Sequence, residues 1–256
     1  MEQHAASAYL HRLGVRGPVP PTAETLRQLH EAHLLAVPFE NLSIHWQEPI
    51  VLSDDALFEK IVVRRRGGFC YELNGLFAAL LRSLGFDVTM LSAEVADDRG
   101  GFGPPFDHMA LAVMLEDLWL ADVGFGDSFR LPLILGYRGE QTQGDDVFRI
   151  HAVGEQFVVS RRSERADWRP QYRFTLAPHE YADYEEMCRH HQTSPHSHFT
   201  QQRICSRATI DGRISVSPRR LITTRGRVRE EVELATEAEY TNALRELFGI
   251  IPTAPA

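Results

Sequence analysis

The 256-residue sequence contains no apolar run long enough to span a bilayer and no excess of basic residues. Its 27 lysines and arginines are outnumbered by 35 aspartates and glutamates, and the formal net charge of −8 disfavours a nucleic acid as partner. Residues 1–4 also lack the basic and apolar character with which a secretory signal begins. We therefore expect neither a membrane nor a nucleic acid among the partners.

Cysteine is scarce as well. Cys70, Cys188 and Cys205 are odd in number and far apart, which argues against a disulfide framework and favours the reducing cytoplasm. No Gly-x-x-x-x-Gly-Lys motif is present, so a nucleoside triphosphate is not expected. Four histidines lie close together in the sequence: His190, His191, His196 and His198. No cysteine or carboxylate accompanies them at the spacing of a metal site, so we expect no metal.

The spacing of the hydrophobic residues changes along the chain. Up to Gly85, apolar side chains recur at helical intervals, and beyond it they alternate as in strands. The last quarter mixes the two patterns. We therefore predict an α+β protein with a helical block over 1–85, a β-rich block over 86–193 and a mixed block over 194–256, packed as one fused unit.

The first block predicts four helices. One ends at Gly14, a second ends before Pro38, and a third has Ser53 as its capping residue. The fourth begins near Cys70, keeps its apolar side chains on one face, and ends at Gly85. Because this last pattern is the strongest, Cys70 is expected on a buried and rigid helix.

The rest of the chain predicts strands and two further helices. The expected strands cover residues 88–95, 108–115, 118–123, 147–153, 157–161, 203–210, 213–216, 221–224 and 228–234. Asp211-Gly212 and Arg225-Gly226 are expected to form hairpin turns. Helices are expected over 181–190 and 237–248, the second ending at Gly249.

The segment from Arg66 to Asn74 carries the clearest chemical signal. It places Cys70 where the Gly67-Gly68 turn runs into a helix. The positive end of a helix dipole favours thiolate over thiol, and thiolate is the nucleophilic form. We therefore expect Cys70 to be a nucleophile with a lowered pKa.

A nucleophilic cysteine needs a base and an acid that orients the base. His108 begins an apolar strand, and Asp122 ends the next one. A two-residue turn at Glu116-Asp117 would place Asp122 opposite Leu111 and turn His108 to the other face of the sheet. A three-residue loop or a bulge would return both side chains to one face. We therefore predict an odd-numbered loop or a bulge in this hairpin.

Several motifs together resemble a known family. They are Arg66–Cys70, His108, the segment from Asp122 to Gly126, Val37–Leu42 and Ser194–Phe199. In combination they resemble the signature of the arylamine N-acetyltransferases over nearly the whole chain.

This resemblance implies a fold, a reaction and a set of roles. The fold is a helical bundle, an antiparallel β-barrel and an α/β lid around a core like that of cysteine proteases. Cys70, His108 and Asp122 would form a catalytic triad. Cys70 would take an acetyl group from acetyl-coenzyme A and pass it to an arylamine or arylhydrazine in a ping-pong reaction, without a metal or prosthetic group.

The resemblance also implies binding residues. The acceptor pocket would be lined by Phe39, Val95, Phe125, Phe129 and Phe199. Coenzyme A would lie near Gly103, Gly124 and Gly126. Glu40 and Arg66 would form a structural ion pair, and Asn74 would hydrogen-bond to Asp122. Residues 127–132 depart from the family pattern, which leaves the acceptor preference open.

Three alternatives stay open. An amide synthase of the same fold would move a larger acyl chain from a carrier protein. A thiol hydrolase of the papain or transglutaminase type would pass the acyl group to water or lysine. A binding protein would keep the fold with an inactive site. Neither the oligomeric state nor the physiological acceptor follows from the sequence.

Overall fold

Helices form the N-terminal layer of the computed structural model, which describes residues 1–163 and 166–251. Gly14 ends the first helix in a left-handed conformation with φ 74°, and the Thr22 hydroxyl caps the second by accepting from the Thr25 N–H. The helices of this layer are α1 (Gln3–Leu13), α2 (Ala23–Ala36), α3 (Leu42–His45), α4 (Asp54–Phe58), the π-helix η1 (Glu59–Val63) and α5 (Cys70–Ser83). The four long helical patterns of the first block are thus confirmed.

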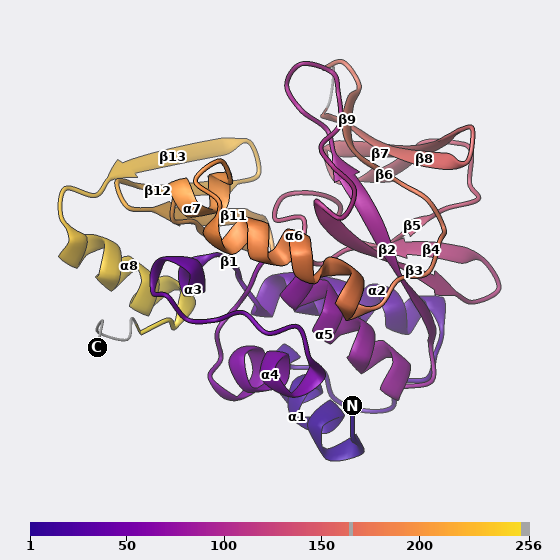
Figure 1. Ribbon diagram of the computed structural model, residues 1–256, viewed down its shortest axis with the longest axis horizontal. Coiled ribbons are helices and arrows are strands. Elements are labelled where there is room, and N and C mark those ends of the chain that lie inside the picture. The colour runs from indigo at the N-terminus through magenta and orange to yellow at the C-terminus, as the bar shows by residue number, and fades with distance from the viewer. Residues whose placement is uncertain (164–165, 252–256) are drawn as a thin grey trace.

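An antiparallel sheet of eight strands follows, in the order β5-β4-β3-β2-β9-β8-β7-β6 (Figure 1). Its strands are β2 (Asp87–Val95), β3 (His108–Met114), β4 (Leu118–Ala121), β5 (Leu133–Ile134), β6 (Gln141–Gln143), β7 (Asp146–Val153), β8 (Gln156–Ser163) and β9 (Arg169–Phe174). Two glutamines of β6 join the edge strands. Gln141 exchanges two hydrogen bonds with the backbone of Ile134, and Gln143 bonds to the backbone of Arg130 and Leu131. These side chains nearly close the sheet into a barrel.

A second antiparallel sheet has the order β1-β10-β11-β12-β13. Its strands are β1 (Phe39–Glu40), β10 (Cys205–Thr209), β11 (Gly212–Ser217), β12 (Arg220–Arg225) and β13 (Val228–Glu233). The C-terminal part also contains α6 (Tyr181–Thr193), α7 (His198–Gln201) and α8 (Glu237–Phe248). Because β1 pairs with β10, the helical block contributes a strand to the C-terminal sheet.

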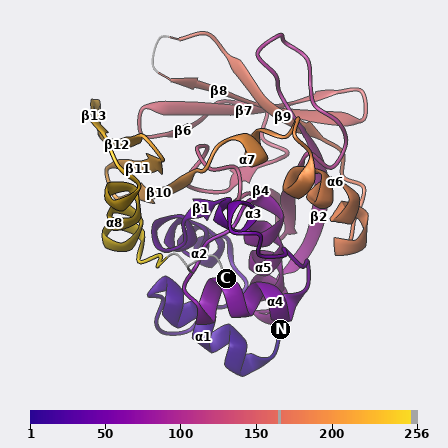
Figure 2. The ribbon, with the colours of Figure 1, turned by 60° about the vertical axis from the view of Figure 1, so that its left-hand side comes forward.

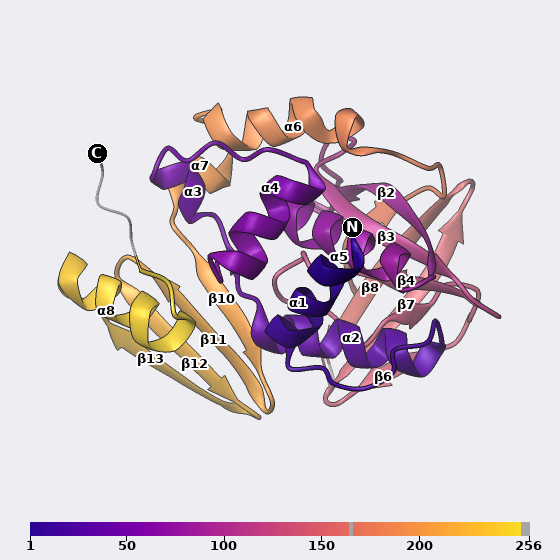
Figure 3. The ribbon, with the colours of Figure 1, turned by 90° about the horizontal axis from the view of Figure 1, so that it is seen from below.

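Figure 2 shows the helical layer below the two sheets, and Figure 3, seen from below, shows it in front with the second sheet to one side. Helix α5 packs against β2 and β3, whereas α2 packs against β10. Buried apolar side chains of α5, β2 and β3 belong to one continuous core. Helix α5 also contacts α1 and α4, so it is buried between this sheet and its neighbouring helices, as its apolar pattern predicts.

The hairpin turns of the second sheet lie one residue away from their predicted positions. Thr209 pairs with Gly212, so the turn is Ile210-Asp211, and Arg225 pairs with Val228, so the next turn is Gly226-Arg227. Gly212 belongs to β11, where a Cβ atom would collide with the backbone of the neighbouring strand. Close strand packing, rather than turn geometry, explains this glycine.

Short strands were missed by the periodicity. β1 and β5 have two residues each and β6 has three, so no alternation can be read from them. β9 contains Pro170, which argues against a strand.

Among the described residues, no helix combines the length and apolar character needed to cross a membrane.

Candidate active site

The backbone before α5 places Cys70 at the first helical position. Gly67 has no room for a Cβ atom against the Pro38 carbonyl, and the Gly68 carbonyl accepts from the Glu40 N–H at 2.9 Å. Two sequence motifs thereby meet at the start of the helix. Glu72 caps this end by accepting from the Phe69 N–H at 3.1 Å. Cys70 is 3% exposed.

The β3–β4 hairpin brings the other two triad candidates together. Met114 pairs with Leu118, which leaves the three-residue loop 115–117. Leu111 pairs with Ala121. The prediction of an odd-numbered loop is therefore confirmed, and His108 and Asp122 lie on one face. His108 Nε2–H donates to Asp122 Oδ2 at 2.8 Å.

Asp122 is buried and receives further hydrogen bonds. Asn74 Nδ2 donates to Oδ1 at 2.9 Å, and so does the Gly124 N–H at 2.9 Å. Burial alone would raise the pKa of Asp122, but His108 and these donors outweigh it and hold the pKa below its usual value. The carboxylate is charged and fixed in place. The Asn74 side chain also accepts from the Val123 N–H, so it ties α5 to the end of β4.

The thiol does not have the lowered pKa that the helix dipole predicts. Burial raises the pKa of Cys70 well above its ordinary value, and Asp107 and Asp122 add to this effect. Only the backbone of Met109 acts in the opposite direction. The prediction that the helix dipole by itself lowers this pKa is wrong, because desolvation of a thiolate outweighs the field at the helix end. Thiolate formation at Cys70 therefore requires a nearby proton acceptor.

Aromatic rings enclose the imidazole. The ring of Phe125 stands perpendicular to His108 with centroids 5.3 Å apart, and the ring of Tyr172, on β9 of the same sheet, lies 5.2 Å away. Tyr172 is fully buried, and burial together with Asp122 raises its pKa. Tyr172 was not among the predicted site residues because its strand, β9, was not predicted.

The five predicted acceptor residues come from four parts of the chain: β1, β2, the loop after β4 and α7. The rings of Phe39 and Phe199 lie 6.2 Å apart, while Phe125 contacts His108. Phe129 is buried in the barrel core against Phe148. Val95 pairs with Tyr172 within the sheet.

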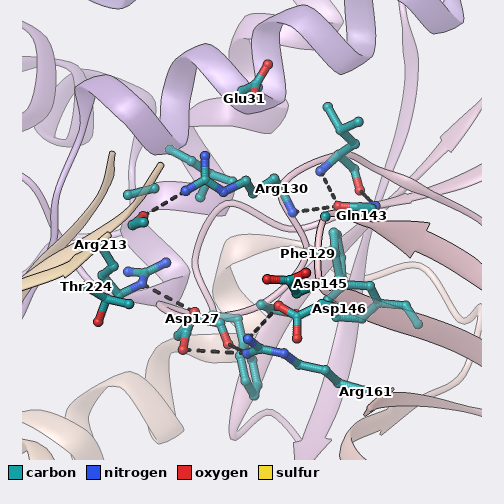
Figure 4. Close-up of a pocket in the computed structure, with 18 of the residues that line it drawn as sticks. Glu31, Asp127, Phe129, Arg130, Gln143, Asp145, Asp146, Arg161, Arg213 and Thr224 are labelled. Atoms are coloured by element: carbon teal, nitrogen blue, oxygen red, sulfur yellow. Dashed lines mark hydrogen bonds and ion pairs between the residues drawn. The ribbon is translucent and has the colours of Figure 1, made fainter. Parts of the chain in front are cut away.

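A cavity of about 540 Å³ lies beside Asp122, between the loop after β4, the β6–β7 turn and the second sheet (Figure 4). Phe125, Gly126 and Phe129 line it. Of the three glycines predicted near coenzyme A, Gly126 therefore reaches this cavity. Gly103 lies instead where its N–H donates to the Val95 carbonyl, and Gly124 lies against Cys70.

The arginines of this cavity are already engaged. Asp127 lies between Arg213, at 3.3 Å, and Arg161, at 3.5 Å, and Arg161 also contacts Asp146 at 2.7 Å (Figure 4). The Arg130 guanidinium donates to three carbonyl oxygens at the β10–β11 turn. These contacts make the wall polar without leaving it strongly positive.

A second network supports the cysteine segment from behind. Arg66 contacts Glu40 at 2.8 Å, and both are buried. Asn41, whose role was missed, donates to the carbonyl oxygens of Phe199 and Gln202. It therefore joins the segment Val37–Leu42 to the segment Ser194–Phe199. No group of three or more metal-ligating side chains is placed to hold a metal within residues 1–163 and 166–251.

Gly124 gives a direct test of the contact between the hairpin and α5. A Cβ atom there would lie 2.8 Å from Cys70 Cα and 2.7 Å from Asn74 Nδ2. Gly124→Ala is expected to lower the free energy of unfolding by about 1–3 kcal/mol and to slow chemistry at Cys70, because α5 and the loop must separate. Urea unfolding and enzyme assays measure both effects.

Gly136→Ala is the matched control. A Cβ atom there meets nothing within 4 Å, and its backbone is not in the left-handed region. Its stability should stay within about 0.5 kcal/mol of the parent. Equal tolerance of both substitutions would contradict the tight contact at Cys70.

Comparison with known proteins assigns the family. A model of an N-acetyltransferase family matches residues 22–253. An arylamine N-acetyltransferase from Mycolicibacterium smegmatis is 34% identical over 249 residues, which cover 94% of this chain and 90% of that protein. The chain belongs to the arylamine N-acetyltransferase family.

One solved structure and one further relative bear on the acyl donor and the reaction type. A structure of Mycobacterium marinum arylamine N-acetyltransferase in complex with CoA has a TM-score of 0.88 and 32% identity, and covers 96% of this chain and 92% of that one. Proansamycin X synthase from Amycolatopsis mediterranei (strain S699) is 32% identical over 244 residues, covering 92% of this chain and 93% of that protein. The predicted α+β fold is confirmed by its likeness to arylamine N-acetyltransferase structures.

Proposed function

We propose that this enzyme takes an acetyl group from acetyl-coenzyme A onto Cys70 and passes it to an aromatic amine or hydrazine. The observation that carries the proposal is the hydrogen-bonded pair of His108 and Asp122, presented by one hairpin beside the first residue of α5. Gly124, two residues after Asp122, lies directly against Cys70. Family membership and the CoA-bound neighbour support acetyl-coenzyme A as donor.

The first half-reaction forms the acyl-enzyme. His108 Nε2–H stays on Asp122, so Nδ1 is the nitrogen left to accept the Cys70 proton. The sulfur attacks the thioester carbonyl, the bond from carbon to the coenzyme A sulfur breaks, and the departing thiolate takes the proton from His108. Asp122 stabilises the imidazolium while it carries this proton.

The second half-reaction transfers the acetyl group. The amine nitrogen attacks the acetyl carbon, His108 accepts the proton that the nitrogen loses, and Cys70 leaves as thiolate. Burial of Cys70 limits access of water, which favours transfer to an amine over hydrolysis.

An amide synthase of the same fold is the second candidate. It is favoured by the similarity to proansamycin X synthase and by a cavity of about 540 Å³ next to Asp122. Such an enzyme would use the same three residues but accept a larger acyl group. Acyl-chain length in a donor series separates the two candidates.

We further propose the cytoplasm as compartment, which the free thiols of Cys70, Cys188 and Cys205 support. The division into blocks at 1–85, 86–193 and 194–256 is proposed with one qualification, since β1 of the first block pairs with β10 of the third.

Mass spectrometry tests the proposed reaction. After incubation with acetyl-coenzyme A, an acetyl adduct is expected on Cys70, absent in Cys70→Ala, and it should disappear when an arylamine is added. Cys205→Ala is the control, because Cys205 is an equally buried thiol in the second sheet. An adduct that decays equally fast without amine would favour a hydrolase, and no adduct with acetyl-coenzyme A but one with longer acyl donors would favour the amide synthase.

A further inference from the structure

A buried histidine of α2 joins the two ends of the loop that follows β4. His30 Nε2 accepts a hydrogen bond from the Asp122 N–H at 3.0 Å. Its Nδ1–H donates to the Arg130 carbonyl at 2.7 Å. His30 is fully buried, and its ring stacks on Phe129 at 5.7 Å with an interplanar angle of 16°. One side chain thus fixes both ends of residues 122–130.

Three residues of this loop contact His108 or Cys70. Asp122 holds His108, Gly124 contacts Cys70, and Phe125 packs on the His108 ring. A displacement of either end of the loop would therefore alter the alignment of base and nucleophile. Errors of about 1 Å in such alignments can cost roughly 100-fold in rate.

The hydrogen bonds require a neutral ring. Burial lowers the pKa of His30 to about 4, although its partners on Arg130 and Asp122 oppose the shift. A neutral imidazole has one donor and one acceptor, which matches the Arg130 carbonyl and the Asp122 N–H. A protonated ring could not accept from Asp122.

We propose that His30 is a positioning residue, which aligns Asp122 with His108 by holding both ends of loop 122–130. The proposal rests on the proposed function, because His30 acts through the triad. It also assigns a role to a side chain of α2, an element that carries none of the reacting groups.

His33 provides a matched control on the same helix. It is as fully buried as His30 and packs against the rings of Tyr9 and Phe77. Within the described chain, neither of its ring nitrogens has a hydrogen-bond partner. His30→Phe and His33→Phe therefore both replace a buried imidazole with a ring, but only the first removes hydrogen bonds to the loop.

Two readouts separate positioning from packing. His30→Phe is expected to lower kcat/KM for acetyl transfer by roughly 10- to 100-fold, mainly through kcat, while His33→Phe changes it less than about threefold. The pH profile of iodoacetamide alkylation at Cys70 should also shift upward only in His30→Phe, since a misaligned His108 is a poorer acceptor for the thiol proton.

Conservative variants assign the effect to one hydrogen bond. In His30→Gln the amide oxygen can occupy the place of Nε2 and accept from Asp122. In His30→Asn the amide nitrogen can occupy the place of Nδ1 and donate to Arg130. If His30 acts through Asp122, kcat should be closer to the parent value in His30→Gln than in His30→Asn. Both variants keep a polar side chain, so they still test the proposal if His30→Phe does not fold.

The outcomes are distinct. Equal activities and equal alkylation profiles for His30→Phe and His33→Phe would overturn the proposal. Full activity of His30→Leu, whose side chain can form neither hydrogen bond, would also overturn it. Lack of an acetyl adduct in the parent enzyme would instead refute the proposed function. The alkylation profile needs no acyl donor, so it still tests His30 in that case.

Discussion

Asp122→Asn is expected to lower kcat/KM about 10³- to 10⁴-fold, as loss of the orienting carboxylate does in other triads. Asp122 accepts hydrogen bonds from His108, Asn74 and Gly124. An asparagine has one acceptor oxygen, and its NH₂ group would face one of these donors. Because the site is buried, the free energy of unfolding should also fall by about 3 kcal/mol. Steady-state kinetics and urea unfolding measure the two losses.

Asp117→Asn is the control for this change. Asp117 is exposed in the three-residue loop of the same hairpin, and its substitution by asparagine removes the same charge. Its activity and stability should match those of the parent enzyme. Near-normal activity of Asp122→Asn in a folded protein would show that His108 does not depend on this carboxylate.

His108→Gln is expected to slow alkylation of Cys70 at pH 7 by about 100-fold or more. Burial raises the pKa of Cys70, so without a proton acceptor little thiolate forms at neutral pH. In the parent enzyme, transfer of the proton to His108 should let the reaction titrate below the free-thiol value of about 8.5. In the variant the titration should move above that value. Initial rates with iodoacetamide between pH 5 and 10 give both curves.

His151→Gln serves as control, since His151 is exposed on β7. It should reproduce the parent profile. A parent enzyme that titrates at or above the free-thiol value would show that Cys70 is not coupled to His108, and the first half-reaction proposed above would then be wrong.

Local patterns predicted the elements that carry Cys70, His108 and Asp122. The uninterrupted helical spacing after Cys70 identified α5, because one face of a buried helix must be apolar. Alternation identified β3 and β4, and the parity of side chains along strands required an odd-numbered loop or a bulge between His108 and Asp122, which the three-residue loop fulfils. These inferences succeeded because they depend on residues close together in the sequence.

Features that join distant segments did not follow from local patterns. Tyr172 lies on a strand with a proline, and β1 consists of two residues that pair with β10. Asn41 bonds to carbonyl groups more than 150 residues away. His30 showed no chemical signal in the sequence, yet it reaches both ends of loop 122–130.

The sequence by itself determined the candidate nucleophile, its helix, and the hairpin that pairs His108 with Asp122, because the periods of helix and strand specify which side chains share a face. Only the tertiary structure decided how strongly burial opposes ionisation of Cys70. Its sequence position at a helix start favours thiolate, but packing against β3 and the β4 loop removes water and raises its pKa. Desolvation depends on how completely distant segments cover the sulfur, and no local pattern contains that information.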